Sequence, residues 1–413
     1  MTLDRQMLEM GARARVAADL LRNAPADQRS AAIRTIAIRL RAAQEAILAA
    51  NAADVAEAGN MVDRLRLDAA RLEDIAAGLE QVAALPDPVG AIMGQWTRPN
   101  GLSFAQVRTP IGVIGMIFES RPNVAADAAA ICIRSGNALI LRGGSDAFRS
   151  CTAIHDAVAA GLVDAGLPAD AVQMVPTSDR AAVGHMLAGL GGAIDLIVPR
   201  GGRDLVARVE AEARVPVLGH LDGVCHTYAH ASADPGMAIE IVRNAKLRRV
   251  AVCGATETLL IDRAAAPELL PRIAARLAEE GTEIRGDAET CALLPEAIPA
   301  TEADWRTEYL APVLAVRIVA GLDAAIAHIA RFGSGHTEAI VAGDEAAATA
   351  FLARVDSAIV IWNASTQFAD GGEFGFGAEI GIATGRLHAR GPVGPEQLTT
   401  YKYVVRGSGQ IRP

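Results

Sequence analysis

An alternation of strand-like and helical segments, which begins near residue 99, most constrains how this chain can fold. Pro110-Ile-Gly-Val-Ile-Gly-Met-Ile-Phe118 is a nearly continuous apolar run, as expected for a parallel strand that is buried on both faces. Strand-like segments at 138–141, 172–175 and 194–198 then alternate with helical segments at 147–162, 179–190 and 203–213. This rhythm predicts a doubly wound α/β domain.

A second α/β region is expected from near residue 222. Its strand-like and helical segments follow one another at 257–261, 264–280, 313–319, 322–331, 338–341, 344–354 and 358–362. Residues 1 to about 85 differ, because their apolar positions recur at helical spacing with charges between them. We expect that first segment to be a helical packing layer without chemistry of its own.

Composition and charge narrow the class of function. The 413 residues carry 39 Lys and Arg against 48 Asp and Glu, a net charge of −9. With no basic block, nucleic acid is not an expected partner. The five cysteines form no metal-binding spacing, so we expect no metal, and their scatter is typical of a reducing compartment. No secretory signal is evident, and no apolar run reaches the about 18 residues that span a membrane. The expected location is therefore the cytoplasm.

Cys253 is the strongest candidate for chemistry. It follows a short apolar run and precedes Gly254, after which an apolar run resumes. A thiol at such a turn is open to a substrate while its backbone is held still, and a thiolate is among the best protein nucleophiles near neutral pH. The alternative is a buried structural cysteine.

Two glycine-rich turns are candidates for binding the phosphates of a dinucleotide. They are Leu141-Arg142-Gly143-Gly144-Ser145 and Val198-Pro199-Arg200-Gly201-Gly202. Such turns expose backbone N–H groups at the start of a helix. Neither turn has the GxGxxG pattern, so packing alone is the alternative. Arg142 stands where NAD-specific folds place an acid, which favours NADP(H), unless it is an ordinary surface arginine.

Several stretches carry a resemblance to a known family. They are Pro110-Ile-Gly-Val-Ile-Gly-Met-Ile-Phe-Glu-Ser-Arg-Pro-Asn123, Ser135-Gly-Asn-Ala-Leu-Ile-Leu-Arg-Gly-Gly144, Asp195-Leu-Ile-Val-Pro-Arg-Gly-Gly202, His220-Leu-Asp-Gly-Val-Cys-His226, Cys253 with its apolar strand, Ala325-Ile-Ala-His-Ile-Ala-Arg-Phe-Gly-Ser-Gly-His-Thr-Glu338, Asn363-Ala-Ser-Thr366, Asp370-Gly-Gly372, Phe374-Gly-Phe-Gly-Ala-Glu379 and Leu387-His-Ala-Arg-Gly-Pro392. In this order they resemble the aldehyde dehydrogenase superfamily, and within it the gamma-glutamyl phosphate reductases, also called glutamate-5-semialdehyde dehydrogenases.

The resemblance implies an aldehyde-dehydrogenase-like α/β fold with three parts. We expect a Rossmann-type NADP-binding domain (1–99 and 109–221), an α/β catalytic domain (222–396) and β strands for oligomerisation (100–108 and 397–413). The strands near 101–108 and 398–405 are expected to pair and to bridge subunits of a homo-oligomer. The alternative is a pair of edge strands within one chain.

The implied reaction is the reduction of L-glutamyl 5-phosphate by NADPH to L-glutamate 5-semialdehyde with release of phosphate, in proline biosynthesis. Glutamate 5-kinase is the implied partner that hands over the substrate. Two alternatives stay open. One is an NAD(P)-dependent aldehyde dehydrogenase that forms an acid by hydrolysis, and the other is a nucleotide-binding scaffold without catalytic activity.

The resemblance also assigns roles to residues. Cys253 is the nucleophile that carries a thioester, and Asn123 is the side-chain donor to the oxyanion, although Asn123 also fits a turn residue after Pro122. Glu308 holds the nicotinamide ribose, or is an ordinary surface acid. Arg142, Gly143, Gly144, Ser145, Pro199, Arg200, Gly201 and Gly202 hold the rest of the cofactor.

The substrate is expected to need two anion sites, because it carries a phosphate and an α-carboxylate. Arginine matches phosphate oxygens with two parallel hydrogen bonds. The candidate residues around the substrate are Arg121, Arg386, Arg390, His388, Asn363, Ser365 and Thr366. Each arginine is also a candidate for a structural ion pair.

Two departures from generic aldehyde dehydrogenases bear on the reaction. The segment that carries their deacylating glutamate reads His220-Leu221-Asp222-Gly223 here, so that acid is missing, unless Asp222 is a shifted replacement. Loss of a base that activates water fits a reductase, which must keep water from its thioester. Gly254 stands where the family commonly has Asn, which leaves the geometry around the thiol less defined.

Overall fold

The computed structural model describes residues 2–58 and 62–412, and it forms two compact units. Unit 1 contains Met1–Gly219, Gly375–Gly381 and Val393–Pro413, and unit 2 contains His220–Phe374 and Ile382–Pro392. The first boundary lies at Gly219 and His220, and the Gly-rich segment near the C-terminus contributes to both units.

Helices make up most of unit 1. They are α1 (Leu3–Asn23), α2 (Ala26–Ala42), α3 (Gln44–Glu57), α4 (Val62–Leu65), α5 (Ala69–Ala84), α6 (Val124–Arg134), α7 (Phe148–Asp164), α8 (Ala181–Leu187) and α9 (Arg203–Glu212). The first helix shows why this segment folds as it does. Met7, Met10, Ala14, Ala17 and Leu21 recur every three or four residues and are buried, so one stripe faces the core.

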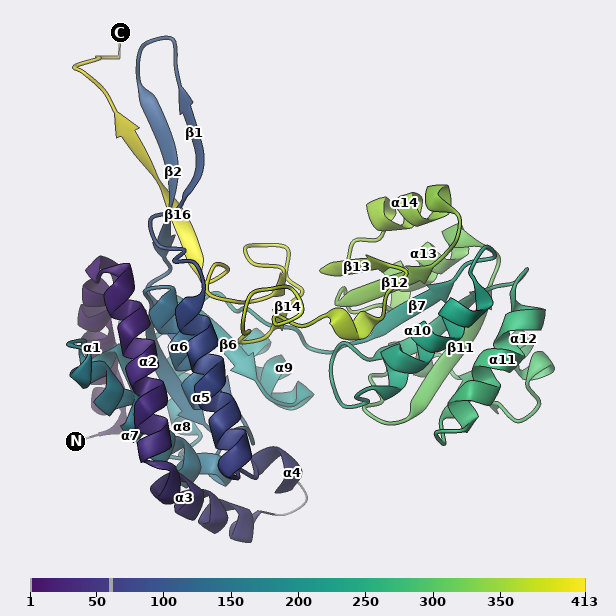
Figure 1. Cartoon of the computed structure of the whole chain (residues 1–413), viewed down its shortest axis with the longest axis horizontal. Coiled ribbons are helices and arrows are strands. Elements are labelled where there is room, and N and C mark those ends of the chain that lie inside the picture. The colour runs from purple at the N-terminus through teal and green to yellow at the C-terminus, as the bar shows by residue number, and fades with distance from the viewer. Residues whose placement is uncertain (1, 59–61, 413) are drawn as a thin grey trace. The chain divides into compact units, whose positions relative to one another are not determined.

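A four-stranded parallel sheet forms the centre of unit 1 (Figure 1). Its strands are β3 (Val113–Phe118), β4 (Ala138–Gly143), β5 (Val172–Met174) and β6 (Leu196–Arg200), in the order β5-β4-β3-β6. Every residue of β3 and β4 is buried, as their apolar runs predict. The chain passes from β3 to β4 and β5 on one side and then to β6 on the other, so the strand order reverses at β3. Doubly wound folds bind ligands outside the carboxyl ends of strands at such a point.

A separate antiparallel sheet of three strands extends from unit 1 (Figure 1). It contains β1 (Ile92–Thr97), β2 (Ser103–Pro110) and β16 (Thr399–Arg406). The predicted pairing between the two sequence-distant strands is present, with Tyr401 opposite Arg108 and Val405 opposite Phe104. The strand β1 was not predicted, because Gly94 and the exposed side chains of this strand give it no buried face to read from the sequence.

Unit 2 is a second parallel sheet with helices on both faces (Figure 1). The strands, in the order β10-β9-β11-β8-β7-β12-β13, are β10 (Ile298–Pro299), β9 (Glu283–Gly286), β11 (Val313–Val319), β8 (Thr256–Asp262), β7 (Cys225–Ala229), β12 (Thr337–Val341) and β13 (Ile359–Trp362). The helices are α10 (Pro235–Leu247), α11 (Ala266–Ala278), α12 (Ala288–Leu293), α13 (Leu322–Phe332) and α14 (Glu345–Arg354). A short pair, β14 (Ile382–Ala383) and β15 (Gly391–Pro392), completes the unit.

The sequence prediction of unit 2 was incomplete on one side of the sheet. Strands β9 and β10 and helix α12 were missed, because they are short and each strand is only partly buried or exposed. In unit 1, Pro199 and Arg200 are the last residues of β6 and not part of the turn that follows. Among the described residues, no helix combines the length and apolarity needed to cross a membrane.

Candidate active site

The carboxyl edge of the unit 1 sheet brings the two predicted glycine turns together. Phe118, at the end of β3, is in register with Gly143 on one side and with Arg200 on the other. Gly144 and the short helical turn at Ser145–Ala147 follow β4 directly, and Gly201 and Gly202 lead from β6 into α9. The glycines of the first turn precede those of the second by 58 positions, and Pro199 lies beside β3 through the pairing with Ile117.

The residues at this edge fit the phosphates of a dinucleotide. The residue before α9, Gly202, has no side chain with which to cap the helix, and its N–H donates to the Glu119 Oε2 atom at 3.3 Å. Among the described residues nothing lies within 4 Å of where a Cβ on Gly202 would stand. A helix N-terminus with room beside it can bind an anion through its free N–H groups. Within the same described parts, the Nε atoms of Arg142 and Arg200 are buried without a hydrogen-bond partner, and buried donors of this kind are usually satisfied.

Arg142 is not the surface arginine that the sequence left open. Its side chain is buried, and its Nη2 donates to the Ser178 carbonyl oxygen at 2.8 Å. Burial lowers the pKa of the Arg142 guanidinium, and the charge of Glu119 opposes this effect. A buried cation with a free Nε would gain from a phosphate group nearby.

Asn123 and Arg121 follow β3 at the same edge of unit 1. Asn123 occupies the position before α6, and its Nδ2 donates to the Asp127 Oδ2 atom at 2.8 Å. Burial raises the pKa of Asp127 to about 6, although the hydrogen bond from Asn123 acts in the opposite direction. The amide of Asn123 therefore has a fixed orientation, and Arg121 is partly buried two positions before it.

Cys253 lies in unit 2, in the turn between the end of α10 and the start of β8. The strand follows the thiol and does not precede it, which corrects the expectation that a packed apolar segment leads into Cys253. The side chain is partly exposed. Its backbone is pressed against Gly223, where a Cβ would stand 2.3 Å from the Cys253 carbonyl oxygen and 2.6 Å from its Cα. Only glycine at 223 leaves the nucleophile in this place.

Two imidazoles stand beside the thiol. Sulfur or nitrogen atoms of Cys253, His220 and His336 all lie within 4.8 Å of one another, and the two rings meet edge to face with centroids 4.9 Å apart. Nδ1 of His220 is 2.7 Å from the Ile382 carbonyl oxygen, and Nδ1 of His336 is 2.9 Å from the Thr337 hydroxyl. These contacts use the Nδ1 atoms and leave the Nε2 atoms for the thiol.

The environment of Cys253 favours its thiolate. Burial by itself would raise the pKa of the Cys253 thiol, but the charge of His336 and hydrogen bonds from His220 and His336 outweigh burial and hold the pKa well below its usual value. A low thiol pKa beside cationic imidazoles is typical of a reactive cysteine. The alternative of an inert buried cysteine therefore does not fit Cys253.

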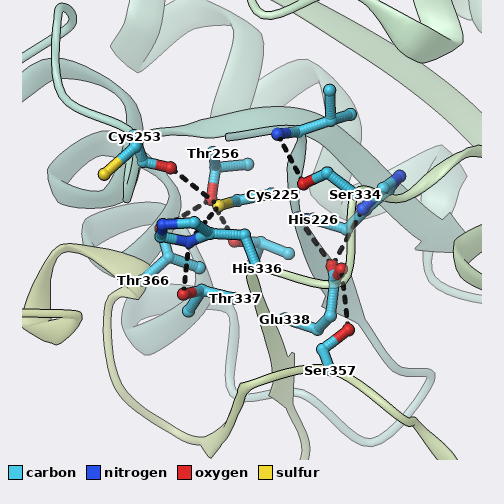
Figure 2. Close-up of polar contacts among 12 residues, drawn as sticks. Cys225, His226, Cys253, Thr256, Ser334, His336, Thr337, Glu338, Ser357 and Thr366 are labelled. Atoms are coloured by element: carbon cyan, nitrogen blue, oxygen red, sulfur yellow. Dashed lines mark hydrogen bonds and ion pairs between the residues drawn. The ribbon is translucent and has the colours of Figure 1, made fainter. Parts of the chain in front are cut away.

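Buried polar side chains around Cys253 form a hydrogen-bond network (Figure 2). The Cys225 thiol donates to the Cys253 carbonyl oxygen at 3.1 Å, and the Thr256 hydroxyl contacts those of Thr227 at 2.7 Å and Thr366 at 3.0 Å. Side-chain hydrogen bonds thus join the start of β7 to the Cys253 turn, and β8 to β7 and to the Thr366 segment.

Glu308 lies on the approach to β11 in the same unit. Burial raises the pKa of the Glu308 carboxyl, whereas a hydrogen bond from the Gly223 N–H lowers it. The next residue, Tyr309, packs over Lys246, whose Nζ is 5.7 Å from the ring centroid. Lys246 pairs with Glu257, and both side chains are fully buried. Burial raises the pKa of Glu257 to about 7, against the effect of Lys246. Glu308 is therefore fixed between the Gly223 loop and a buried ion pair.

The predicted substrate residues of unit 2 are distributed unevenly. Thr366 is buried against Thr256, Ser365 accepts a hydrogen bond from the Gln367 N–H, and Asn363 bonds to the backbone of Ala342 through both amide atoms. Arg390 and Arg386 both pair with Asp356, and His388 is exposed with a φ of 54°. The structure thus brings Thr366 next to the network under Cys253, whereas the arginines have a common carboxylate partner.

Sequence reasoning missed His336, Cys225, Gly223, Lys246 and Glu257, and it gave His220 no role. Both histidines lie in stretches that carried the family resemblance, and each directly follows a glycine. His336 stands immediately before β12, and His220 lies in the loop before β7. The family resemblance identified these two segments, but it did not show that their histidines lie next to Cys253. His220, which belongs to the segment expected to lack the deacylating glutamate, brings an imidazole to the thiol. The absence of the acid alone therefore does not separate reduction from hydrolysis.

Two α/β units, each with a parallel sheet, one with two glycine turns at its sheet edge and the other with an activated thiol, are typical of the aldehyde-dehydrogenase-like class. The sequence model of the aldehyde dehydrogenase family matches residues 4–293. An acetylating aldehyde dehydrogenase from Geobacillus thermoglucosidasius shares the fold, with a TM-score of 0.70 at 18% identity, over 100% of this chain and 99% of that chain.

Closer relatives narrow the assignment. The gamma-glutamyl phosphate reductases of Caulobacter sp. (strain K31) and Caulobacter vibrioides are 63% and 64% identical, over 100% and 98% of this chain and 100% of each relative. The crystal structure of gamma-glutamyl phosphate reductase from Thermotoga maritima matches with a TM-score of 0.96 at 42% identity, over 98% of this chain and 100% of that chain. The chain belongs to the aldehyde dehydrogenase family and, within it, to the gamma-glutamyl phosphate reductases. This family implies a nicotinamide cofactor.

Proposed function

We propose that this chain reduces L-glutamyl 5-phosphate to L-glutamate 5-semialdehyde with NADPH and releases phosphate. The observation that carries the proposal is the partly exposed Cys253 thiol, whose pKa is held well below its usual value by His336 and His220. Relatives named gamma-glutamyl phosphate reductase, at 57–64% identity, support the substrate.

The first step is acylation of Cys253. The thiolate attacks the acyl carbon of the substrate, the C–S bond forms, and the bond from that carbon to the phosphate oxygen breaks. The leaving phosphate takes a proton from an imidazolium of the cluster. His220 is our candidate for this transfer, because its ring is partly exposed whereas His336 is fully buried.

The second step returns the thiol to its starting state. When bound, the reduced nicotinamide supplies a hydride to the thioester carbon. The oxyanion of the resulting hemithioacetal then collapses to the aldehyde and expels the Cys253 thiolate. One proton from solvent restores the imidazolium of His220, so each turnover takes up one proton in total.

The oxyanion in both steps needs hydrogen-bond donors. The Cys253 N–H is one candidate, and Asn123 is the other, because its amide keeps one N–H beyond the bond to Asp127. One such donor is worth roughly 10²–10³ in rate.

The cofactor choice and the assembly belong to the same proposal. Arg142, with its unpartnered Nε, supports NADP(H), since a guanidinium suits the extra 2′-phosphate. We assign the remaining cofactor contacts to the turns Gly143–Ser145 and Pro199–Gly202 and to Glu308, and the leaving phosphate to Arg121. The sheet of β1, β2 and β16 is our candidate for contact between subunits of a homo-oligomer, and glutamate 5-kinase for the source of substrate.

A reverse assay tests the proposal. Glutamate semialdehyde, NADP⁺ and phosphate are mixed with the enzyme in the presence of a chelator, and NADPH absorbance is followed, with Cys253→Ala as the control. Turnover that requires phosphate is expected. Turnover without phosphate supports the hydrolytic aldehyde dehydrogenase, and cofactor binding without turnover supports a scaffold.

A further inference from the structure

A second thiol, Cys225, lies directly under the nucleophile. It is the first residue of β7, where it pairs in register with Thr256, and the register then shifts so that His226 lies opposite Thr258. Its side chain is fully buried. Figure 2 shows its sulfur between the backbone of Cys253 and the ring of His336.

The contacts of Cys225 assign its single hydrogen. The Sγ atom donates to the Cys253 carbonyl oxygen at 3.1 Å and lies 3.5 Å from Nδ1 of His336. Because the S–H hydrogen points to the carbonyl, the sulfur is the acceptor toward His336. Nδ1 of His336 then carries a hydrogen, which it shares between the Cys225 sulfur and the Thr337 hydroxyl at 2.9 Å. Its Nε2 atom is left for the Cys253 thiol.

We propose that Cys225 is a positioning residue, whose thiol holds both the Cys253 carbonyl and the His336 ring so that the Cys253 sulfur and the imidazole meet. The inference rests on the proposed role of Cys253 as nucleophile. Cys225 is neither a reserve nucleophile nor a disulfide partner for Cys253. Burial, followed by the charges of Glu338 and Cys253, raises the pKa of the Cys225 thiol well above its usual value, so Cys225 keeps its proton.

The backbone of Cys253 is constrained from two directions. Gly223 is packed against its carbonyl, and Cys225 donates to the same oxygen. His336 is constrained as well, by Cys225 and Thr337. Reacting groups held within about 0.5 Å of the productive geometry need supporting contacts of this kind. Cys225 contacts both members of the pair, the Cys253 carbonyl and the His336 ring.

The test measures the nucleophile in the free enzyme, without substrate or cofactor. Cys253 is alkylated with iodoacetamide across a pH series with a chelator present, and modified cysteines are identified by mass spectrometry. The titratable groups near Cys253 are His220 from the loop before β7, Cys225 from β7, His336 before β12 and Glu308 before β11, and Asp222 acts on Glu308. They are unchanged among the variants except for Cys225 itself.

We expect Cys225→Ala to move the alkylation midpoint of Cys253 upward by about one pH unit or more, a tenfold loss of thiolate on the acid side. Cys225→Ser should move it less, because a hydroxyl still donates to the Cys253 carbonyl. Cys291→Ala is the matched control, since that thiol contacts Gly286 and Ala297 in the same unit and should leave the midpoint unchanged. In the reverse assay, kcat should fall while the KM for the aldehyde stays constant.

Three results would overturn the proposal. They are an unchanged midpoint in folded Cys225→Ala and Cys225→Ser variants, alkylation of Cys225 as fast as that of Cys253, and a Cys225–Cys253 disulfide in the oxidised native protein. Thermal unfolding identifies any variant that fails to fold. If Cys225→Ala does not fold, the alkylation midpoint of the Cys225→Ser variant decides whether the proposal stands. Because alkylation needs no turnover, the alkylation result would remain valid even if the proposed substrate were wrong.

Discussion

The phosphate edge of unit 1 and the thiol cluster of unit 2 are built in different ways. At the unit 1 edge, the groups that we propose bind phosphates lie in or beside two short turns that follow β4 and β6. The thiol cluster is built from side chains of separate segments that carry His220, Cys225, Cys253 and His336. A backbone site needs open space, whereas a side-chain site needs exact registration of distant segments.

Two glycines illustrate the contrast. A Cβ on Gly201 would stand 2.6 Å from the Glu119 Oε2 and Leu205 Cδ2 atoms, which are ends of side chains that can move. A Cβ on Gly223 would meet the backbone of Cys253 at 2.3 Å. Glycine therefore lies against side chains that can move in unit 1, and against a backbone segment that cannot easily move in unit 2.

Replacing the nucleophile should have the largest effect. Cys253→Ala removes the atom that carries the acyl group, so kcat should fall on the order of 10⁴-fold or more, as in other enzymes that lose their nucleophile. Binding of NADPH, measured by fluorescence titration, should be unchanged, because the proposed phosphate contacts lie in unit 1. A variant with more than a tenth of wild-type turnover would contradict the covalent step.

The glycine pair tests the comparison directly. Gly223→Ala should lower kcat by roughly 10²–10³, since a displacement of about 1 Å in a reacting group can cost 10² in rate. Gly201→Ala, the matched change in unit 1, should lower kcat less than about tenfold, because side chains that can yield surround it. Steady-state kinetics of both variants, with thermal unfolding as the folding control, gives the answer. Equal losses would remove the distinction between the two regions.

Removal of the His336 charge should change the pH dependence of the thiol. A depressed thiol pKa keeps the thiolate present as pH falls through neutrality, and the thiolate is lost only below that depressed pKa. In His336→Gln the pKa should return toward about 8.5, so the alkylation rate at pH 7 should fall at least about tenfold and rise with pH. The matched control is His230→Gln, which changes a partly buried histidine of the same unit that contacts Ser232. Gln367→Glu would not serve as a control, because it adds a charge. If the alkylation rate of the His336→Gln variant did not change with pH around neutrality, groups other than His336 would be the ones that stabilise the thiolate.

A substitution at the sheet edge of unit 1 should change the preference of the enzyme between NADPH and NADH. Arg142→Glu should lower the ratio of kcat/KM for NADPH to that for NADH by at least about tenfold, on the order of 1.4 kcal/mol, because an acid repels the 2′-phosphate. Arg22→Gln, at the end of α1 with an ion pair to Asp19, is the control. Comparable kcat/KM for the two cofactors in the wild-type enzyme, or an unchanged ratio in the variant, would dismiss this role.

The smallest effect is expected at Gly254. A Cβ there would stand 3.1 Å from the Thr366 carbonyl oxygen and 3.4 Å from the Ala369 Cβ, contacts that a shift of a few tenths of an ångström relieves. Gly254→Asn should therefore change kcat by less than about threefold and leave the alkylation midpoint of Cys253 in place. A large loss would mean that this turn is as rigid as the contact at Gly223.

Much of the fold could be predicted from the sequence, because most residues of the buried parallel strands are apolar. The runs that became β3, β4, β11 and β12 were recognised, and so were the glycine turns after β4 and β6. The exposed strand β1 and the short strand β9 were missed, because half-exposed strands lack that signal. In the site, Cys253 stood out through its turn, whereas His336 and Cys225 looked like core residues beside β strands.

The sequence by itself determined the two α/β units, the glycine turns that leave room for phosphates, and a thiol at a turn before a buried strand. These features depend on local periodicity and on residues that are neighbours in the chain. Only the tertiary structure decided which groups activate the thiol. Cys225 and His336 are 111 positions apart, and they meet because the parallel sheet places β7 between β8 and β12. Strand order is set by packing of the whole sheet, so no local pattern encodes that meeting.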